Sequence, residues 1–281
     1  MKPQADISVL SGNYNNAPYL DDFFQSIINS SLQPKELIFI DDGSTDNSLE
    51  MVEKYKHLPY LKLIAIGENI GRSASLNEGK KHCTATYTLL IDPDDILMPD
   101  RIEKQYRFMK NHPEIDVCGG NVEYFNGQTG EKLNESRFPE KNIYETFKKG
   151  ENGVLQPTVI IKTEIYQKYD YKNLVPGQDY DLFARMAKDG YRFANLPDVL
   201  NRMRVHPGSA VSNMTCKSLS KIFDSRDDIF GTQSPQLKKY FYYLHLKYYR
   251  QSMLAENKAK KYFFMALAAA AYPIKILKRL K

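Results

Sequence analysis

Three carboxylates stand within four residues, at Asp92, Asp94 and Asp95, directly after the apolar run 87–91. Carboxylates this close repel one another, so a cation is expected to gather them. Their oxygens suit Mg²⁺ or Mn²⁺, in particular an ion shared with substrate phosphates. Asp-x-Asp alone is a weak signal, because the same residues could form a polar turn before the helix expected near Pro99. The rest of the chain has to decide between these two interpretations.

Short apolar segments that alternate with helical patterns indicate the elements that carry these acids. Strands are expected at 7–10, 36–40, 61–66 and 87–91, with helices between them. The first helix begins at Pro18 and has apolar residues at helical spacing: Leu20, Phe23, Phe24, Ile27 and Ile28. Alternation of strands and helices predicts parallel βαβ units, and therefore an α/β fold with a doubly wound, mostly parallel sheet.

The second half of the chain has a looser pattern. After a helix at 99–111, we expect a strand at 117–125, a hairpin turn at 126–130, a strand at 157–161, a helix that opens at 176–181, and strands at 191–196 and 199–205. Residues 131–153 are polar and carry no assignable pattern. From about Met214 the sequence is typical of helices. We therefore divide the chain into a domain at 1–212 and a helical, basic extension at 213–281.

Acidic residues also end the second expected strand, at Asp41 and Asp42. Ligands of open α/β sheets bind at the carboxyl ends of the strands, so these acids and Asp92–Asp95 should face one crevice. The glycine-rich motifs with which dehydrogenases and P-loop enzymes hold phosphate are absent from the sequence. An acidic crevice would repel a nucleotide diphosphate unless a divalent cation lay between them. This reasoning predicts Mn²⁺ or Mg²⁺ as the cofactor.

Several motifs, taken in order, resemble those of the family 2 glycosyltransferases of GT-A fold, of the bacterial cell-surface polysaccharide type. The resemblance covers about residues 6–212 and rests on Ile7-Ser8-Val9 through Tyr14-Asn15, Asp41-Asp42-Gly43-Ser44, Asn69-Ile70-Gly71, Leu76-Asn77, Asp92-Pro93-Asp94-Asp95, Gln156-Pro157-Thr158, Gln178-Asp179-Tyr180-Asp181 and Arg204-Val205-His206. Each motif is modest evidence by itself. Their joint order and spacing make the resemblance specific.

The resemblance implies a nucleotide-sugar donor and a set of residues that would bind it. Tyr14 would lie against the nucleotide base, and Asp42 would accept a hydrogen bond from that base. Asn77 and Asp92 would complete the donor site, with Asp92 on the ribose hydroxyls. Asp41 would be a structural neighbour. Leu76 stands where many family members carry Arg, which leaves one donor contact open.

The resemblance also implies a metal site and a general base. Asp94 would hold the metal on the diphosphate, and His206 would lie close to both. Asp179 would take the proton of the acceptor hydroxyl, as inverting sugar transfer requires. Gln178 stands where the family usually has Glu, and would contact the acceptor. Asp179 could also cap the helix that follows, and the two roles are compatible.

The composition limits the protein classes and the cellular locations that come into question. The chain has 281 residues, of which 42% are hydrophobic and 26% are charged, as is ordinary for a globular protein. Its three cysteines form no C-x-x-C motif, so neither a disulfide framework nor a structural zinc site is indicated. We recognise no signal peptide and no apolar run of membrane-spanning length. We therefore expect a cytoplasmic location.

Positive charge is concentrated at the end of the chain. Residues 232–281 hold eleven Lys and Arg residues and one acidic residue, whereas the preceding 231 residues carry a net charge of −5. Helices rich in lysine, aromatic and aliphatic residues can lie on an anionic membrane surface, which here would be the inner face of the cytoplasmic membrane. Alternatively, they close the core with a solvated basic face. Nucleic acid is not expected as a partner, because no recognition motif is present.

These observations predict an inverting, metal-dependent glycosyltransferase. It would move a hexosyl or N-acetylhexosaminyl group from a nucleotide sugar, with uridine favoured, to a hydroxyl of a glycan or lipid-linked glycan. One alternative is a sugar-phosphate nucleotidyltransferase, but Gly12-Asn13-Tyr14-Asn15 lacks the basic charge that such a first loop usually has. A second alternative is a non-catalytic protein that binds nucleotide sugars.

Overall fold

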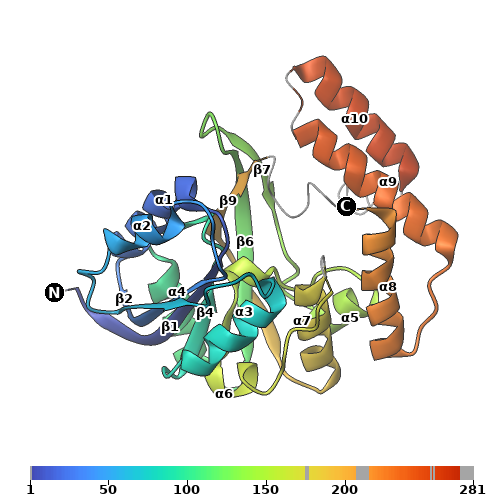
Figure 1. The fold of residues 1–281 in the computed structure, drawn as a ribbon. Coiled ribbons are helices and arrows are strands. Elements are labelled where there is room, and N and C mark those ends of the chain that lie inside the picture. Colours follow the sequence, from blue (N-terminus) through green and yellow to red (C-terminus); the bar gives the residue numbers. More distant parts are fainter. Residues whose placement is uncertain (1, 175–176, 207–214, 254, 256, 273–281) are drawn as a thin grey trace. The chain divides into compact units, whose positions relative to one another are not determined.

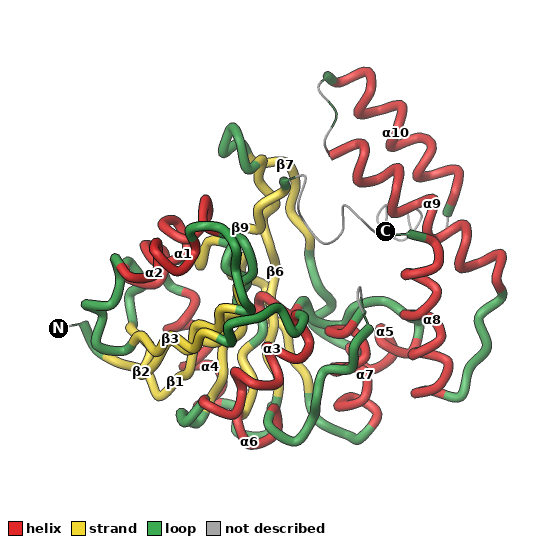
Figure 2. Tube along the Cα trace, viewed as in Figure 1, coloured by secondary structure: helices red, strands yellow, loops and turns green. Residues whose placement is uncertain are grey.

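The computed structural model describes residues 2–174, 177–206, 215–253, 255 and 257–272 (Figures 1 and 2). The boundary that we predicted at residue 212 lies outside these residues, as do the last basic residues of the tail.

Two compact units make up the chain. The first consists of Met1–Leu174 and Gln178–His206, and the second of Val175–Gly177 and Pro207–Lys281. Each unit is described by itself below.

The first unit contains a parallel sheet at its amino-terminal side. Strands β1 (Gln4–Asn13), β2 (Gln33–Asp41), β3 (Leu61–Ala65) and β4 (Tyr87–Leu90) lie in the order β3-β2-β1-β4. All three pairings among them are parallel. Because the strands run in the same direction, Asp41 and the acids that follow β4 emerge at the same edge. The α/β fold and the parallel strands predicted from the sequence are confirmed.

The sheet continues with strands of mixed direction. Next to β4 come β8 (Ile160–Lys162), β6 (Val117–Asn126), β9 (Phe193–Val205) and β5 (Ile96–Leu97), while β7 (Lys132–Ser136) pairs with β6. The antiparallel β6–β7 pair confirms the predicted hairpin. The short 3₁₀ helix η3 (Gln156–Thr158) occupies the start of the segment that we expected to be a strand.

One strand replaces the two that we predicted at 191–196 and 199–205. Strand β9 pairs in parallel with β6, but its register shifts between Leu196, opposite Gly120, and Val199, opposite Asn121. Pro197 lies in this irregularity. Proline has no N–H to donate to a ladder and is tolerated at a bulge, so the strand bends there without ending.

Helices cover both faces of the parallel strands (Figure 1). The 3₁₀ helix η1 (Ala17–Tyr19) precedes α1 (Leu20–Ile28), which joins α2 (Ser48–Glu53) and α4 (Arg101–Asn111) in the main apolar core. Phe23 and Phe24 of α1 pack there against Phe39 of β2. Side chains alternate between the two faces of a strand, so Leu10 and Ile40 point to the opposite side.

Helix α3 (Arg72–Gly79), followed by the 3₁₀ helix η2 (Lys80–His82), lies on that opposite face. A Cβ atom on Gly79 would come within 2.7 Å of Leu10 and Ile40, so glycine allows the helix to approach the sheet closely. The remaining helices of this unit are α5 (Ile143–Lys148), α6 (Thr163–Tyr166) and α7 (Gln178–Lys188). Thus α5 and β7 occupy the segment that carried no assignable pattern.

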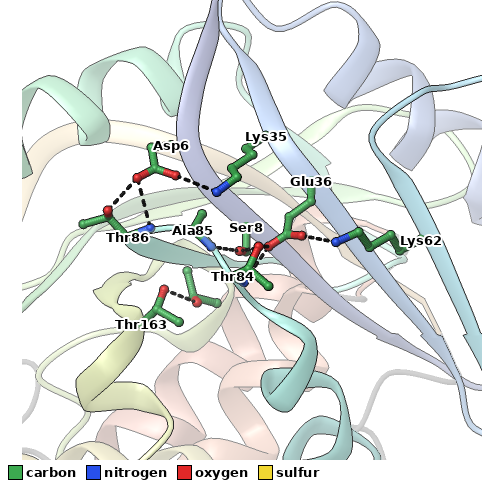
Figure 3. A network of polar contacts seen from close by, with 10 residues as sticks. Asp6, Ser8, Lys35, Glu36, Lys62, Thr84, Ala85, Thr86 and Thr163 are labelled. Atoms are coloured by element: carbon green, nitrogen blue, oxygen red, sulfur yellow. Dashed lines mark hydrogen bonds and ion pairs between the residues drawn. The ribbon is translucent and has the colours of Figure 1, made fainter.

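A buried carboxylate joins the amino-terminal ends of the parallel strands (Figure 3). Glu36 Oε1 accepts hydrogen bonds from the Ser8 hydroxyl at 2.5 Å and from the Thr84 amide at 2.6 Å, and Oε2 accepts one from Lys62 at 2.5 Å. Burial alone would raise the pKa of Glu36, but these hydrogen bonds outweigh it and lower the pKa to about 2. This acid therefore holds three strands together at the edge opposite to the crevice.

The second unit contains three described helices: α8 (Cys216–Phe230), α9 (Gln236–Met253) and α10 (Lys258–Ala271). Helices α9 and α10 lie side by side, and the buried His245 ring bonds the Ala268 carbonyl at 2.8 Å. Lys239 pairs with Asp224 of α8. Within the described part of the chain, no helix is both long and apolar enough to cross a bilayer.

Candidate active site

A cleft of about 190 Å³ opens at the carboxyl ends of β1 and β2, beside the start of α3. Its walls come from the end of β1, the loops after β1, β2 and β3, and the start of α3: Gly12, Asn13, Tyr14, Asn16, Asp42, Asn69, Gly71, Arg72 and Ser75. Tyr14 is 44% exposed, so its ring is accessible to a planar ligand. Two of the predicted donor-binding residues, Tyr14 and Asp42, are thus brought together.

Asp42 is tied to the opposite wall of this cleft. Its two carboxylate oxygens accept hydrogen bonds from the backbone N–H groups of Ile70 at 2.9 Å and Gly71 at 3.1 Å. Burial raises the pKa of Asp42, although these two hydrogen bonds oppose the shift. Gly43 follows with φ +69°, and any side chain there would collide with the backbone of Glu68. Each oxygen keeps a second lone pair with which to accept from a ligand.

Asp41 has a different environment. Its carboxylate accepts hydrogen bonds from Asn13 Nδ2 at 2.8 Å and from the Ser44 amide at 2.9 Å. It is buried at the end of β2, and its contacts are those of the structural neighbour that we had expected.

Asp92 forms an ion pair with Arg72, the first residue of α3. Arg72 Nη2 lies 2.5 Å from Asp92 Oδ1, and the side chains are 36% and 23% exposed. Burial raises the pKa of Asp92, while the charge of Arg72 opposes this and that of Asp94 adds to it. The nearby Asp92 raises the pKa of Arg72 in return, so the guanidinium is firmly charged. Arg72 therefore brings a cation to the wall of the cleft, beside the acids.

Asp94 and His206 meet although 112 residues separate them. His206 Nε2 lies 3.0 Å from Asp94 Oδ2, because β9 ends beside the loop that follows β4. The His206 ring also packs on Tyr19, with ring centroids 4.8 Å apart. Among the described residues, no group of three or more His, Cys, Asp or Glu side chains is arranged to hold a metal ion. The Asp94–His206 pair consists of one carboxylate oxygen and one imidazole nitrogen in contact.

Asp95 is the most deeply buried acid of this loop. Its Oδ1 accepts a hydrogen bond from the Arg204 amide at 3.1 Å, whereas its Oδ2 has no partner among the described residues. Burial, together with the charges of Asp94 and Asp92, raises the pKa of Asp95 well above its usual range. Asp95 is not among the residues that line the cleft.

Arg101 contacts the end of β4, just before the acidic loop, and we did not predict it as a residue of the site. The side chain is fully buried and donates to five neutral acceptors: Gln105 Oε1, Pro157 O, Asn201 Oδ1, Leu90 O and, at 3.5 Å, Val159 O. Burial lowers its pKa to about 9, although the charge of Asp95 opposes the shift. The sequence does contain a signal for its burial, because Arg101, Gln105 and Met109 recur every four residues and so lie on one face of α4. Arg101 fixes the end of β4 from which the acids emerge.

Asp179 and Gln178 begin helix α7. Burial raises the pKa of Asp179, and the charge of Arg72 opposes the shift while that of Asp92 adds to it. Arg72 and Asp92 belong to the candidate site, so the pKa of Asp179 depends on the charges gathered there. Gln178 is buried, and its Oε1 has no hydrogen-bond partner among the described residues. A buried amide oxygen without a donor is suited to accept a hydrogen bond from a ligand.

Asn77 is engaged elsewhere. Its Nδ2 donates to the Tyr171 carbonyl at 3.0 Å, and its Oδ1 accepts from the Tyr171 amide at 2.8 Å. Both ends of the side chain are thus used by one backbone segment, and Asn77 is absent from the lining of the cleft. No pattern in the sequence indicates this partner, which lies 94 positions away.

The fold and this edge define the protein as an α/β protein of GT-A fold. The structure resembles the *Staphylococcus aureus* TarS fragment 1–349 in complex with UDP-GlcNAc, with a TM-score of 0.64, 19% sequence identity and coverage of 96% of this chain and 92% of that one. It also resembles the mannosyltransferase PcManGT from *Pyrobaculum calidifontis* in complex with GDP-Man and Mn²⁺, with a TM-score of 0.61, 18% identity and coverage of 95% and 74%. At such identities the likeness establishes the fold.

Sequence comparison gives the family. Residues 8–170 match the model of glycosyl transferase family 2, and the chain belongs to this family. It is 30% identical over 210 residues to the amylovoran biosynthesis glycosyltransferase AmsE of *Erwinia amylovora*, which covers 73% of this chain and 78% of that protein. It is 27% identical over 188 residues to an *Escherichia coli* UDP-Gal:alpha-D-GlcNAc-diphosphoundecaprenol beta-1,3-galactosyltransferase, with coverage of 66% and 68%. The predicted family is confirmed.

Proposed function

We propose that this protein is an inverting glycosyltransferase that moves a sugar from a nucleotide donor to a hydroxyl group, with Asp179 as the general base. The observation that carries the proposal is the cleft lined by Tyr14, Asp42 and Arg72, with the Arg72–Asp92 ion pair beside it. The charges of Arg72 and Asp92 also act on Asp179. A base with a raised pKa accepts a proton more readily than an ordinary carboxylate. Its position in the first turn of α7 keeps the ionised form accessible.

The donor would be held by residues of the cleft. Tyr14 would stack on the base, Asp42 would accept a hydrogen bond from it, and Asp92 would bind the ribose hydroxyls. Arg72 would contact the diphosphate, because a guanidinium presents two parallel donors to phosphate oxygens. The Arg72–Asp92 pair is partly exposed, and such pairs contribute little to stability, so a ligand could separate them at low cost.

A divalent cation fits the pair Asp94 and His206. Their oxygen and nitrogen converge at 3.0 Å, and a cation of the Mn²⁺ or Mg²⁺ type is often held by one or two protein ligands plus substrate phosphates. When bound there, the ion would neutralise the diphosphate and stabilise the charge that develops on this leaving group. The two protein ligands leave the remaining positions to the donor and to water.

Asp179 would remove the proton of the acceptor hydroxyl while that oxygen attacks the anomeric carbon from the side opposite the diphosphate. Gln178, with its unpartnered Oε1, would accept a hydrogen bond from a second hydroxyl of the acceptor. Asn77 stays a predicted donor residue, but its contacts with Tyr171 favour a structural role, which we develop below.

The similar proteins support a proposal for the donor and for the acceptor. We infer a uridine diphosphate hexose or N-acetylhexosamine, supported by the galactosyltransferase relative, and a glycan or lipid-linked glycan as acceptor. PcManGT binds GDP-Man, so a guanosine donor is the competing possibility.

A thermal-shift panel tests donor and metal together. UDP-linked and GDP-linked sugars are added to the full-length protein with Mn²⁺, with Mg²⁺ and with EDTA, and release of nucleoside diphosphate is measured in parallel. We expect the melting temperature to rise with one nucleotide class and to rise more with metal, because ligands that bind the native state stabilise it. Absence of any shift or turnover with all nucleotide sugars would contradict the proposed function. Formation of pyrophosphate from sugar phosphate and nucleoside triphosphate would support a nucleotidyltransferase.

We propose further that the second unit attaches the protein to an anionic membrane surface, at the inner face of the cytoplasmic membrane. On α10, Tyr262, Phe263 and Met265 are 66%, 60% and 41% exposed, and the exposed Lys258 and Lys261 stand beside them. Large apolar side chains grouped on a helix surface are unusual for a protein exposed to water alone. Aromatic residues bordered by lysines match the interface of a bilayer that contains anionic lipid.

Vesicle binding tests this attachment. Full-length protein should sediment with vesicles of phosphatidylcholine and phosphatidylglycerol, and much less with phosphatidylcholine alone. The double variant Tyr262→Ser with Phe263→Ser should lose most of this binding. Tyr144→Ser, which changes a 40% exposed tyrosine of the first unit, is the matched control and should bind normally. Equal binding by the double variant and the control would contradict the proposal.

A further inference from the structure

The segment Tyr169–Lys172, named here the bridging segment, connects helix α3 with helix α7. On the α3 side, Asn77 bonds both the amide and the carbonyl of Tyr171, at 2.8 and 3.0 Å. The Ser73 hydroxyl donates to the Lys172 carbonyl at 3.0 Å. Lys80 Nζ donates to the Tyr169 carbonyl at 2.6 Å. The backbone of the segment is therefore bound along one face of α3, at residues one turn apart.

The other side of the bridging segment is bound to α7 through Asp181. This carboxylate is fully buried and lies 3.2 Å from Lys172 Nζ and 2.7 Å from Arg185 Nε. Arg185 Nη2 in turn donates to the Asp170 carbonyl at 2.6 Å. A buried carboxylate between two cations fixes a helix strongly, because loss of one partner leaves charge uncompensated. Asp181 stands two residues after Asp179 in the first turn of α7.

Helix α3 also carries Arg72 at its first position, where it contacts Asp92 of the acidic loop. One rigid helix thus touches the candidate donor site at its start and the bridging segment along its length. From there the contacts lead to the turn of α7 that bears Asp179. No contact in this series needs a residue outside the described parts of the chain.

We propose that Asn77 and Asp181 are positioning residues, which hold the general base Asp179 at a fixed place relative to the donor cleft through the bridging segment. This inference rests on the proposed function of Asp179. It differs from the donor-binding role predicted for Asn77, because the amide acts on the backbone of Tyr171 and touches no substrate. A base must lie within hydrogen-bond reach of its proton, and a displacement of about 1 Å can lower the rate about a hundredfold.

Asn77→Ala and Asp181→Asn test the proposal in the full-length enzyme, with the donor identified by the thermal-shift panel and release of nucleoside diphosphate as the readout. We expect each variant to lower kcat by tenfold or more, while the KM for the donor and the binding of nucleoside diphosphate change less than twofold. Glu78→Ala, a change of a 40% exposed side chain on the same helix, is the control and should keep the normal kcat.

The decisive measurement repeats Asn77→Ala in the Asp179→Asn background. If Asn77 acts through Asp179, the second substitution should lower kcat less than twofold further, because residues that act as one unit are not additive. An equal loss in both backgrounds, or a raised donor KM with unchanged kcat, would overturn the inference. Ser73→Ala removes a single bond and gives a milder test, should Asn77→Ala fail to fold. A wild-type protein that turns over no donor would instead contradict the proposed function.

Discussion

The pKa values of carboxylates at the two edges of the parallel sheet are shifted in opposite directions. At the amino-terminal edge, Glu36 receives hydrogen bonds from Ser8, Lys62 and Thr84, and its pKa falls to about 2 (Figure 3). At the carboxyl-terminal edge, burial raises the pKa of Asp42, Asp92, Asp95 and Asp179. A carboxylate supplied with donors stabilises the fold. Carboxylates whose donors do not outweigh burial favour binding of a proton, a cation or a substrate hydroxyl.

The difference between the pKa shifts at the two edges has a simple physical cause. Donors from β1 (Ser8), β3 (Lys62) and the turn before β4 (Thr84) converge on Glu36, so they come from three segments. At the other edge the strands end in loops, and the loops carry acids themselves. The fold thus separates an edge built for stability from an edge built for ligands, and substitutions at the two should have separable effects.

The largest effect is expected from Asp179→Asn. Removal of a general base should lower kcat by about 10²–10⁴-fold, and stability should stay close to that of the wild type because the charged form is not favoured by burial. Rates of nucleoside diphosphate release and thermal denaturation measure the two effects. Asp198→Asn, a surface acid paired with Lys104, is the control. A kcat within threefold of wild type would remove Asp179 from the chemistry.

The next variant should lower stability and leave activity unchanged, which is the reverse of what we expect for Asp179→Asn. Glu36→Gln should lower the free energy of unfolding by about 2–3 kcal/mol, because a buried acceptor network loses its charge, while kcat below the melting temperature stays normal. Urea denaturation measures the loss, and Glu53→Gln, an acid 50% exposed on α2, is the control. Loss of activity without loss of stability would contradict the division between the two edges.

The same acid predicts a pH dependence. The pKa of Glu36 is about 2 in the folded protein and about 4.3 in an unfolded chain. A lowered pKa means that the stabilisation is fully present above pH ~4.3 and is lost as the pH falls towards 2. The difference in unfolding free energy between wild type and Glu36→Gln should therefore shrink across this window. A constant difference from pH 7 to pH 3 would show that the network does not depend on the charge.

A smaller effect is expected from Arg72→Met. Loss of a charge-assisted contact should weaken binding of UDP, or of GDP if the panel selects guanosine, by about tenfold or more. Binding of the corresponding nucleoside, which has no phosphate, should not change. Isothermal titration with both ligands gives the comparison, and Arg107→Met, on the exposed face of α4, is the control. Equal weakening of nucleoside and nucleotide would show that Arg72 supports the cleft as a whole.

Lys62→Met should have the smallest effect. Its ammonium contacts Glu36, but the side chain is 53% exposed, so water competes for the charge. We expect a loss below about 1 kcal/mol in the free energy of unfolding, measured in urea. A loss as large as that of Glu36→Gln would mean that the lysine, and not the hydroxyl and amide donors, carries the network.

Much of the candidate site could be predicted from the sequence because its acids follow apolar runs directly. Asp42 and Asp92–Asp95 end strands whose alternation with helices requires parallel pairing, and parallel strands release their carboxyl ends at one edge. The single strand β9 was not predictable in the same way. In the sequence, Pro197 indicates the end of a strand, and its place in a bulge becomes visible only from the pairing of β9 with β6.

Local patterns of residues were enough to predict the alternation of elements, the edge at which the acids collect and the family motifs, since these depend on neighbouring residues and on strand direction. Which polar groups have partners depends on the packing of segments that are distant in the sequence. Asn77 meets Tyr171, Arg101 meets Asn201, and Asp94 meets His206 across about a hundred residues. Hydrogen bonds form over about 3 Å, so packing between distant segments, and not local sequence, selects the acids that remain available for a ligand.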